Sequence, residues 1–365
     1  MSEWQTFCLK DLGKIVGGAT PSTNNPKNYG NKIAWITPKD LSTLQGRYIE
    51  KGSCSISRSG FKSCSCVLLP KHAILFSSRA PIGYVAIAKK RLCTNQGFKS
   101  IIPNKKIYFE FLYYLLKYHK DNISNIGGGT TFKEVSGATL GLFQVKIPPT
   151  YYEQQKIART LSVLDQKIEN NHKINELLHT LAYKIYEYYF KYKPKNAKLE
   201  QIIIENPKSS IMVKNAQKTQ DKYPFFTSGD NILSYPKAII DGRNCFLNTG
   251  GNAGIKFYVG KASYSTDTWC ICANEFSDYL YLLLSNIKTH INQSFFQGTS
   301  LKHLQKNLLK KYPIYMPSAH EIKKFNQIIM PLLTLISINT RTSKKLEQIR
   351  DFLLPLLLKQ QVKPK

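Results

Sequence analysis

Three polar side chains in the first half of the sequence carry groups that read base edges in nucleic acids. Arg79 follows two serines, and a guanidinium can grip guanine or a phosphate with two parallel hydrogen bonds. A surface salt bridge is the alternative explanation for this arginine. Asn95 and Gln96 carry amides that can read adenine, although capping of a turn explains them about equally well.

A larger set of residues offers hydroxyl, amide and ammonium groups that fit a phosphate backbone. These candidate backbone contacts are Lys39, Lys99, Thr130, Thr131 and Lys133 in the first half of the chain, and Asn248, Thr249, Asn252, Lys256, Ser300 and Lys302 in the second. Each lysine, taken alone, is explained more simply as a solvated surface charge. The glycines at 127–129 either let the backbone approach a phosphate or simply turn the chain.

Part of this set belongs to an internal repeat. The sequence Gly-Thr-Thr-Phe-Lys at 129–133 returns as Gly-Thr-Ser-Leu-Lys at 298–302, which is 169 residues later. A strand-like run ending in proline follows each copy, at 145–148 and 314–317, and a long helical segment follows each run. This order of module, helix, module and helix predicts two similar surfaces related by a pseudo-twofold axis.

The net charge indicates what kind of partner such surfaces would meet. The chain has 52 lysines and arginines against 23 aspartates and glutamates, so its formal charge is +29, far more than solubility requires. Nucleic acid is the leading partner on this ground. A membrane surface is the weaker candidate, because no cluster of basic residues flanks a lipid anchor or a strongly amphipathic terminal helix. The plainer alternative is a basic protein from a lysine-rich proteome.

Composition and length are those of a folded chain of two or three domains, with 365 residues of which 42% are hydrophobic. The longest apolar run, at 352–358, is too short to span a bilayer, and the N-terminus lacks the features of a signal peptide. We therefore expect a cytoplasmic protein with no membrane partner. The eight cysteines are expected to be reduced, and the pairs at 64/66 and 270/272 fit packing better than a metal site.

Turn signals and periodicity divide the chain into four segments and predict the α+β fold class. We place the first β-rich module at 1–149, the first helix at 150–195, the second module at 196–318 and the second helix at 319–365. In the first module we expect strands at 73–76 and 84–88 and a helix at 108–119. In the second we expect strands at 245–247 and 255–259 and a helix at 278–284.

The two long helical segments carry a four-three spacing of apolar residues with polar residues at the middle, which predicts an antiparallel coiled coil. The expected pairing residues are Ile157, Leu161, Leu164, Ile168, Asn171, Asn175, Leu178 and Ile185 in the first helix, and Phe325, Ile329, Leu332, Ile336, Asn339, Ser343, Leu346 and Leu353 in the second. An antiparallel register sets Asn171 near Ser343 and Asn175 near Asn339. The alternative is that each helix packs only on its own module.

Three residues of the second helix do not fit a continuous apolar seam. Arg350 interrupts the spacing, and Pro331 and Pro355 should kink the helix or end it early. The first helix, if it runs over 151–192, would be ~63 Å long at 1.5 Å per residue.

The sequence resembles the specificity subunits of type I restriction-modification systems over nearly its whole length. The signatures that carry this resemblance lie at 17–22, 33–40, 78–83, 94–97 and 223–230, and at the helix opening 153–165. The second helix keeps Glu321 but has Leu333 where Asp165 would recur, so equal contacts by the two helices are not expected.

The resemblance implies a DNA-recognition subunit that is not itself an enzyme. Each module would be a target-recognition domain reading one half of a split double-stranded DNA target. The paired helices would set the gap and dock methyltransferase subunits, and restriction and translocase subunits would complete the complex. S-adenosylmethionine, ATP and Mg would be bound by those partners, with no cofactor on this chain.

The residues agree with this role, since the sequence contains no amino-methylation motif, no dinucleotide fingerprint and no complete P-loop. Two alternatives stay open. One is a self-sufficient nucleic-acid-modifying enzyme with unrecognised motifs, and the other is an RNA-binding or scaffolding protein with duplicated modules.

Overall fold

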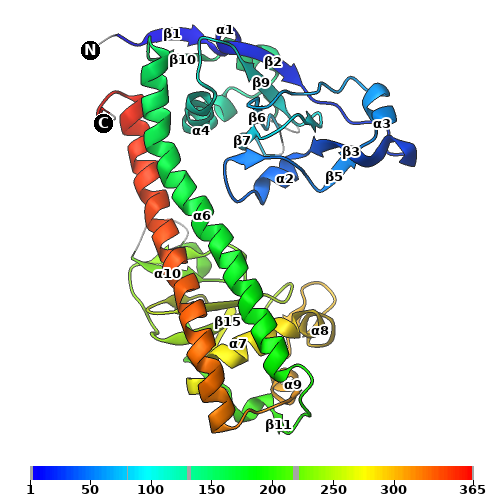
Figure 1. The fold of residues 1–365 in the computed structure, drawn as a ribbon, viewed down its shortest axis with the longest axis vertical. Coiled ribbons are helices and arrows are strands. Elements are labelled where there is room, and N and C mark those ends of the chain that lie inside the picture. Colours follow the sequence, from blue (N-terminus) through cyan, green and yellow to red (C-terminus); the bar gives the residue numbers. More distant parts are fainter. Residues whose placement is uncertain (1–2, 80, 130–132, 217–221, 364–365) are drawn as a thin grey trace. The chain divides into compact units, whose positions relative to one another are not determined.

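The computed structural model describes residues 3–79, 81–129, 133–216 and 222–363 (Figure 1). The chain forms two compact units. Unit 1 comprises Met1–Asn170 and Lys345–Lys365, and unit 2 comprises Asn171–Lys344. Each of the two long helices contributes residues to both units.

Unit 1 contains a five-stranded sheet with the order β2-β9-β6-β7-β4 and a three-stranded sheet with the order β5-β3-β8. The elements of this half of the chain are β1 (Gln5–Cys8), α1 (Leu9–Leu12), β2 (Gly13–Gly17), a 3-10 helix (Pro26–Asn28), β3 (Tyr29–Ile36), α2 (Pro38–Ser42), β4 (Tyr48–Ile49), β5 (Cys54–Ile56), α3 (Arg58–Lys62), β6 (Ile74–Phe76), β7 (Val85–Ala88), β8 (Cys93–Thr94), β9 (Lys99–Pro103), α4 (Phe109–Asn125), α5 (Gly137–Leu142), β10 (Gln144–Ile147) and α6 (Tyr151–Phe190).

The predicted strands at 73–76 and 84–88 are found as β6 and β7, and the predicted helix at 108–119 is found as α4. All three residues of β6 are buried, as a central strand covered on both faces requires. Helix α4 packs on β6 and β7 and is buried without interruption from residue 110 to residue 116. This rigid layer supports the loop that carries Arg79.

Unit 2 contains a four-stranded sheet with the order β12-β18-β15-β16 and a three-stranded sheet with the order β14-β13-β17. The elements of this half of the chain are β11 (Ala197–Lys198), 3-10 helices (Leu199–Gln201, Val213–Asn215, Asn274–Phe276), β12 (Ile204–Glu205), β13 (Tyr223–Phe226), β14 (Leu233–Tyr235), β15 (Arg243–Asn248), β16 (Ile255–Val259), β17 (Ser263–Tyr264), β18 (Thr268–Cys272), α7 (Ser277–Asn286), α8 (Lys288–Ser294), β19 (Phe296–Gln297), β20 (His303–Leu304), α9 (Lys306–Lys310), β21 (Pro313–Ile314) and α10 (Ala319–Leu358).

The two units repeat one topological plan. The order β12-β18-β15-β16 corresponds strand for strand to β2-β9-β6-β7, and unit 1 adds only β4 at the edge. In each three-stranded sheet the central strand pairs antiparallel with one neighbour and parallel with the other. The β11–β21 pair likewise matches the β1–β10 pair. The fold is thus mixed α and β with two repeated domains.

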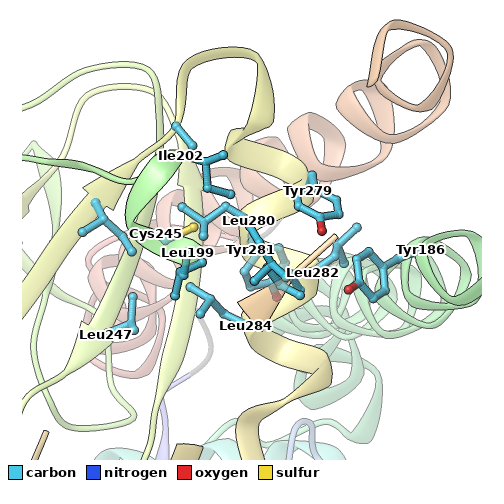
Figure 2. Close-up of a cluster of buried hydrophobic side chains, with 14 of the residues drawn as sticks. Tyr186, Leu199, Ile202, Cys245, Leu247, Tyr279, Leu280, Tyr281, Leu282 and Leu284 are labelled. Carbon is cyan, nitrogen blue, oxygen red and sulfur yellow. The ribbon is translucent and has the colours of Figure 1, made fainter. Parts of the chain in front are cut away.

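The core of unit 2 forms around α7, in which every residue from Ser277 to Leu284 is buried. Figure 2 shows Leu280 and Leu284 of this helix in the same cluster as Cys245 and Leu247 of β15. Tyr186 of α6 joins this cluster, and so does Phe325 of α10. A helix that is apolar all round must be covered on all sides, and the sheet and the long helices supply that cover.

Helices α6 and α10 each span 40 residues. The expectation that Pro331 or Pro355 ends the second helix early is wrong, because α10 continues to Leu358. Pro331 lies on the exposed face with Gln327, whose carbonyl is the one left without an intrahelical donor. The loss therefore falls on the solvent side, while the opposite face of the helix stays packed in the core.

Cysteines in the described part of the chain serve packing. All are free thiols, and Cys66, Cys93, Cys245 and Cys270 are buried. Among the described residues, no group of three or more histidine, cysteine or acidic side chains is placed to hold a metal ion. No helix within the described ranges combines the length and apolar character needed to cross a bilayer.

Candidate nucleic-acid interface

Arg79 follows the buried strand β6 and is separated from it by Ser77 and Ser78, which are buried within the turn. The Ser77 hydroxyl accepts a hydrogen bond from the Tyr84 amide at 2.8 Å and donates to the Pro81 carbonyl at 2.8 Å. The Ser78 hydroxyl donates to the Gly97 carbonyl at 3.2 Å. Because these bonds fix the turn, the arginine that follows is held at the surface, with its side chain 37% exposed.

Glu134 brings two of the predicted cations together. Its carboxylate lies 3.5 Å from the Arg79 guanidinium and 3.3 Å from the Lys99 ammonium. Backbone bridges join Glu134 to Arg79 and to Gly128, so the loop that follows α4 is tied to the end of β6. Lys133 is exposed beside this cluster. The salt bridge foreseen as the alternative for Arg79 is present, and it leaves the guanidinium partly open to solvent.

Thr130 and Thr131 lie outside the described residues, so their candidate role as backbone contacts stays a prediction. Glu134 was not identified from the sequence. The available signal was its position directly after Lys133 in the repeated motif. An acidic residue there partly neutralises the two cations, and it would have to release them for a phosphate to take its place.

Asn95 caps a turn, which was one of its two expected roles. Its Oδ1 accepts a hydrogen bond from the Gly97 amide at 3.0 Å. Gln96 is exposed, and its Oε1 accepts a hydrogen bond from the Thr20 hydroxyl. Gln96 therefore presents its amide nitrogen at the surface, whereas the Asn95 oxygen is already used within the fold.

Lys39 is exposed on the short helix α2, which begins with a capping box between Thr37 and Asp40. The Asp40 carboxylate accepts hydrogen bonds from the Thr37 and Ser53 amides, both at 2.7 Å. Burial alone would raise the pKa of Asp40, but these hydrogen bonds outweigh it and lower the pKa. Asp40 is thus a structural anion that positions the helix carrying Lys39.

In unit 2 the structure gathers predicted residues from two separate loops. The Gly251 amide donates to the Lys302 carbonyl at 2.9 Å, and the Leu304 amide donates to the Thr249 carbonyl at 3.0 Å. The Thr249 hydroxyl donates to the Asp267 carbonyl at 2.8 Å. The glycine turn after β15 is therefore bound to the hairpin between β19 and β20, which carries the second copy of the repeated motif.

The side chains of this second cluster divide into two groups. Asn252, Ser300 and Lys302 are exposed. Lys256 instead donates to the Thr227 carbonyl at 2.8 Å and to Asn248 Oδ1 at 3.2 Å, and burial lowers the pKa of its ammonium. Asn248 and Lys256 therefore hold the turn together from within, and their candidate role as backbone contacts stays a prediction.

The two clusters occupy the same place in the repeated plan. In unit 1 the loop after α4 is bridged to Arg79 in the turn after β6, and in unit 2 the β19–β20 hairpin is bridged to the residues after β15. Each cluster presents at least one exposed or partly exposed cation. These are Arg79, Lys99 and Lys133 in the first cluster and Lys302 in the second. The repeat in the sequence is thus a repeat of a surface loop and of the strand end that supports it.

Arg47 connects the first module to α6 within unit 1. Its side chain is 3% exposed and lies 3.0 Å from the Glu110 carboxylate of α4 and 3.1 Å from the Glu169 carboxylate of α6. Asp165 lies 4.0 Å from the same guanidinium and accepts a 2.5 Å hydrogen bond from the Tyr114 hydroxyl. Burial raises the pKa of Tyr114 well above its ordinary value, so this phenol stays protonated and donates. No local pattern in the sequence identified Arg47.

Arg243 makes a comparable set of contacts in unit 2, although it lies at the start of β15 and not at the position that matches Arg47. Its guanidinium binds both carboxylate oxygens of Asp278, at the start of α7, and donates to the Thr334 hydroxyl of α10 at 2.9 Å. Burial raises the pKa of Asp278 even though Arg243 opposes the shift. In both units an arginine therefore joins an acidic residue in the first turn of the module's own helix to one long helix.

Within each unit a segment of α6 lies alongside a segment of α10 (Figure 1). In unit 2 the Asn171 amide donates to the Ser343 hydroxyl at 3.1 Å, and the Asn339 amide donates to Asn175 Oδ1 at 2.9 Å. These are the two polar pairs of the antiparallel register. In unit 1, Arg350 binds Asp165 at 2.7 Å, so it does not simply interrupt the seam as expected.

Comparisons with known proteins agree with this duplicated plan. The sequence matches the family described as type I restriction modification DNA specificity domain over residues 1–180 and again over 195–348. It is 32% identical to the type I restriction enzyme MjaIX specificity subunit of Methanocaldococcus jannaschii, over 98% of this chain and 93% of that protein. It is 31% identical to the HindI specificity subunit of Haemophilus influenzae, over 46% of this chain and 37% of that protein.

A solved structure has the same fold. The crystal structure of the type I restriction-modification S subunit from M. genitalium aligns with a TM-score of 0.65, covering 98% of this chain and 96% of that one at 17% sequence identity. On the double family match and the full-length relative, the chain belongs to the type I restriction modification DNA specificity family, whose members are recognition subunits rather than catalytic enzymes.

Proposed function

We propose that this chain is the DNA-specificity subunit of a type I restriction-modification complex, in which each module reads one half of a split double-stranded target. The observation that carries the proposal is the repeated pair of bridged loops, each at the same place in the repeated sheet plan. Such a pair fits a target of two specified halves, because each loop cluster can meet its own stretch of duplex.

Charge and residue chemistry favour duplex DNA as the ligand. The formal charge of +29 supplies the general attraction to phosphates, which is independent of sequence. Arg79 and Gln96 in the first module, with Asn252 and Lys302 in the second, supply groups at the surface that bind phosphates or base edges. Arg79 and Lys99 would exchange their ion pairs with Glu134 for contacts with a phosphate when DNA binds.

The long helices are proposed to set the unspecified gap between the two halves of the target. A helix of 40 residues is ~60 Å long at 1.5 Å per residue. Continuous antiparallel pairing of α6 and α10 as a coiled coil, with the modules related by a pseudo-twofold axis, would hold the reading surfaces at a constant separation. The hydrogen bonds of Asn171 and Asn175 support this register.

The proposed domain division follows from the same plan. Two target-recognition domains at 1–149 and 196–318 would alternate with two conserved helices at 150–195 and 319–365. The compact units cut across the helices, because each module packs on segments of both. We take the helices as a separate functional part since their proposed role, spacing and docking, differs from that of the modules.

An exposed apolar stripe on α6 supports docking of a methyltransferase subunit. The stripe comprises Ile174, Leu177, Leu181 and Tyr188, with exposed fractions from 42% to 87%. Its spacing of three, four and seven residues is that of a coiled-coil seam, so the expected occupant is a helix of the partner. S-adenosylmethionine, ATP and Mg would then act on the methyltransferase and restriction subunits.

Purified components test this function. The chain alone, incubated with DNA, S-adenosylmethionine and magnesium, is expected to neither methylate nor cleave, and adding the methyltransferase subunit is expected to give methylation at one split motif. Methylation or cleavage by the chain alone would overturn the proposal. A second arm titrates salt in binding to duplex DNA and to structured RNA, and tighter binding of RNA at matched ionic strength would also overturn it.

A further inference from the structure

The two long helices are copies of one another, but their packing layers are not identical. Residues of α6 correspond to residues of α10 at an offset of 168, as Asn171 corresponds to Asn339 and Asn175 to Ser343. The pairing observed in unit 2 sets Asn171 against Ser343 and Asn175 against Asn339. Because the two helices share this pattern, two copies of α6 could in principle pair with each other in the same register.

One layer of the seam in unit 1 is charged. Asp165 of α6 and Arg350 of α10 lie 2.7 Å apart, and their side chains are 5% and 13% exposed. Tyr114 donates a hydrogen bond to the other carboxylate oxygen of Asp165. Arg350 also binds Asp351, which is exposed. This ion pair therefore crosses between the helices in a place largely shielded from water.

The layer that the repeat relates to this one is apolar. Residue 333 corresponds to residue 165, and residue 182 corresponds to residue 350. Leu333 of α10 and Ala182 of α6 occupy these positions, and both are buried in the core of unit 2. The chain thus has aspartate against arginine in one unit and leucine with alanine at the matching positions of the other.

We propose that Asp165 and Arg350 make helix pairing selective, so that α6 accepts an α10 segment of this chain and rejects a second copy of α6. In an α6–α6 pair each Asp165 would face Ala182 of the other copy. In an α10–α10 pair each Arg350 would face Leu333. Either arrangement buries charges without their interhelical partners, and it does so twice because the pair is symmetric.

A second set of contacts acts in the same direction. The core of unit 1 holds Leu354, Leu357 and Leu358 of α10, whereas the related positions in unit 2 are Tyr186, Tyr189 and Phe190 of α6. An α6–α6 pair would force aromatic side chains into the space of leucines around the first module. Close-packed cores do not accept such an increase in volume without strain.

The consequence is a rule for which halves can assemble. A first half of the chain, module and α6, would combine with a second half, module and α10, from the same or another copy, and two first halves would not combine. This inference rests on the helix contacts alone. It would stand if the proposed DNA target were wrong, and its failure would leave DNA recognition untouched.

A nicked form of the full chain tests the rule. The link at 191–196 is exposed throughout, so a protease site inserted between Pro194 and Lys195 can be cut after folding. Unlabelled and isotopically labelled nicked protein are mixed, separated in urea and recombined by dilution, and the products are weighed by native mass spectrometry. We expect only pairs of one first half with one second half. Random pairing would overturn the proposal, since it would give first–first, first–second and second–second pairs in a ratio of about 1:2:1.

Variants assign the selectivity to the ion pair. Asp165→Leu with Arg350→Ala copies the apolar layer of unit 2 and is expected to raise the share of like-with-like pairs above that of the wild type. An unchanged share would contradict the proposal. In the intact chain, each single substitution is expected to lower the Tm, and the double substitution is expected to recover most of that loss. A double variant whose loss of Tm equals the sum of the two single losses would also contradict the proposal.

Discussion

Arg47 and Glu169 are 122 positions apart in the chain, yet the Nε of one lies 3.1 Å from the Oε1 of the other. The backbone amide of Arg47 donates to the same carboxylate oxygen at 2.9 Å. This contact ties the first module to α6, the helix that follows it. Arg243 and Thr334 provide the equivalent tie between the second module and α10.

Replacing Arg47 by alanine is expected to destabilise unit 1 strongly. The substitution leaves the buried Glu110 carboxylate without its cation, and removing one partner of a buried pair costs about 3–5 kcal/mol. Urea unfolding followed by circular dichroism measures the change. The matched control is Glu50→Ala, which removes an exposed, solvent-screened pair with Lys89 and should have a much smaller effect. Equal effects of the two substitutions would refute a junction role for Arg47.

Arg79 and Lys99 are expected to contribute to DNA binding through phosphate or base contacts. In the complex with the methyltransferase subunit, Arg79→Ala and Lys99→Ala should each reduce the slope of log Kd against log salt by about one if a phosphate contact is lost. Glu134→Gln should increase affinity, because it removes the carboxylate that competes for both cations. Lys191→Ala, on an exposed turn of the helix end, is the control. Unchanged slopes for both variants would exclude these cations from the interface.

Leu177 is expected to be part of the docking surface for the methyltransferase subunit. Leu177→Glu puts a charge into the centre of the exposed stripe and should reduce co-purification of the partner at least tenfold, since a buried unpaired charge costs several kcal/mol. Thr180→Glu adds the same charge at an exposed position outside the stripe and should leave binding intact. Equal loss in both variants would indicate a general charge effect and not a docking surface.

Glu321 gives the start of α10 a defined pH dependence. Hydrogen bonds from the Ser318 amide and the Tyr315 hydroxyl lower its pKa to about 2, from an ordinary value of 4.5. Because the folded-state pKa is the lower one, the stabilisation is complete above pH 4.5 and is lost as the pH falls toward 2. The Tm difference between the wild type and Glu321→Gln should therefore be largest near neutral pH and shrink below pH 4.5. A difference that stayed constant with pH would rule out this carboxylate as its source, and Glu200→Gln, at an exposed site, is the control.

Features with a short period were predictable from the sequence. Strands β6, β7, β15 and β16 and helices α4 and α7 lie where alternating or helical spacing of apolar residues predicts them. The register of Asn171 with Ser343 also followed from spacing, because the polar positions near the middle of the two seams match one another in an antiparallel pairing. These patterns depend on residues close together in the sequence, so tertiary packing does not alter the elements that they predict.

Contacts between distant residues could not be predicted in this way. Arg350 was interpreted as a break in the seam because its partner, Asp165, lies 185 positions earlier in the chain. A lysine such as Lys256 is expected to be a surface cation, but its ammonium group points inward and donates to the Thr227 carbonyl. Pro331 was expected to kink the helix or end it, yet the carbonyl that it leaves without a donor, that of Gln327, lies on the solvent side. In each case the deciding fact is which face of an element a residue occupies after tertiary packing.

In the proposed function, two modules read two halves of one target across a gap set by paired helices. Methylome sequencing tests it most directly, in cells carrying the methyltransferase partner with the wild-type chain, without the chain, or with residues 172–178 and 336–342 deleted together. Each deletion removes one heptad, ~10 Å of helix, which corresponds to about three base pairs of duplex. We expect a split motif that vanishes without the chain and keeps both halves across a shorter gap in the deletion variant. A motif without a gap, a motif that persists without the chain, or a gap of unchanged length would contradict it.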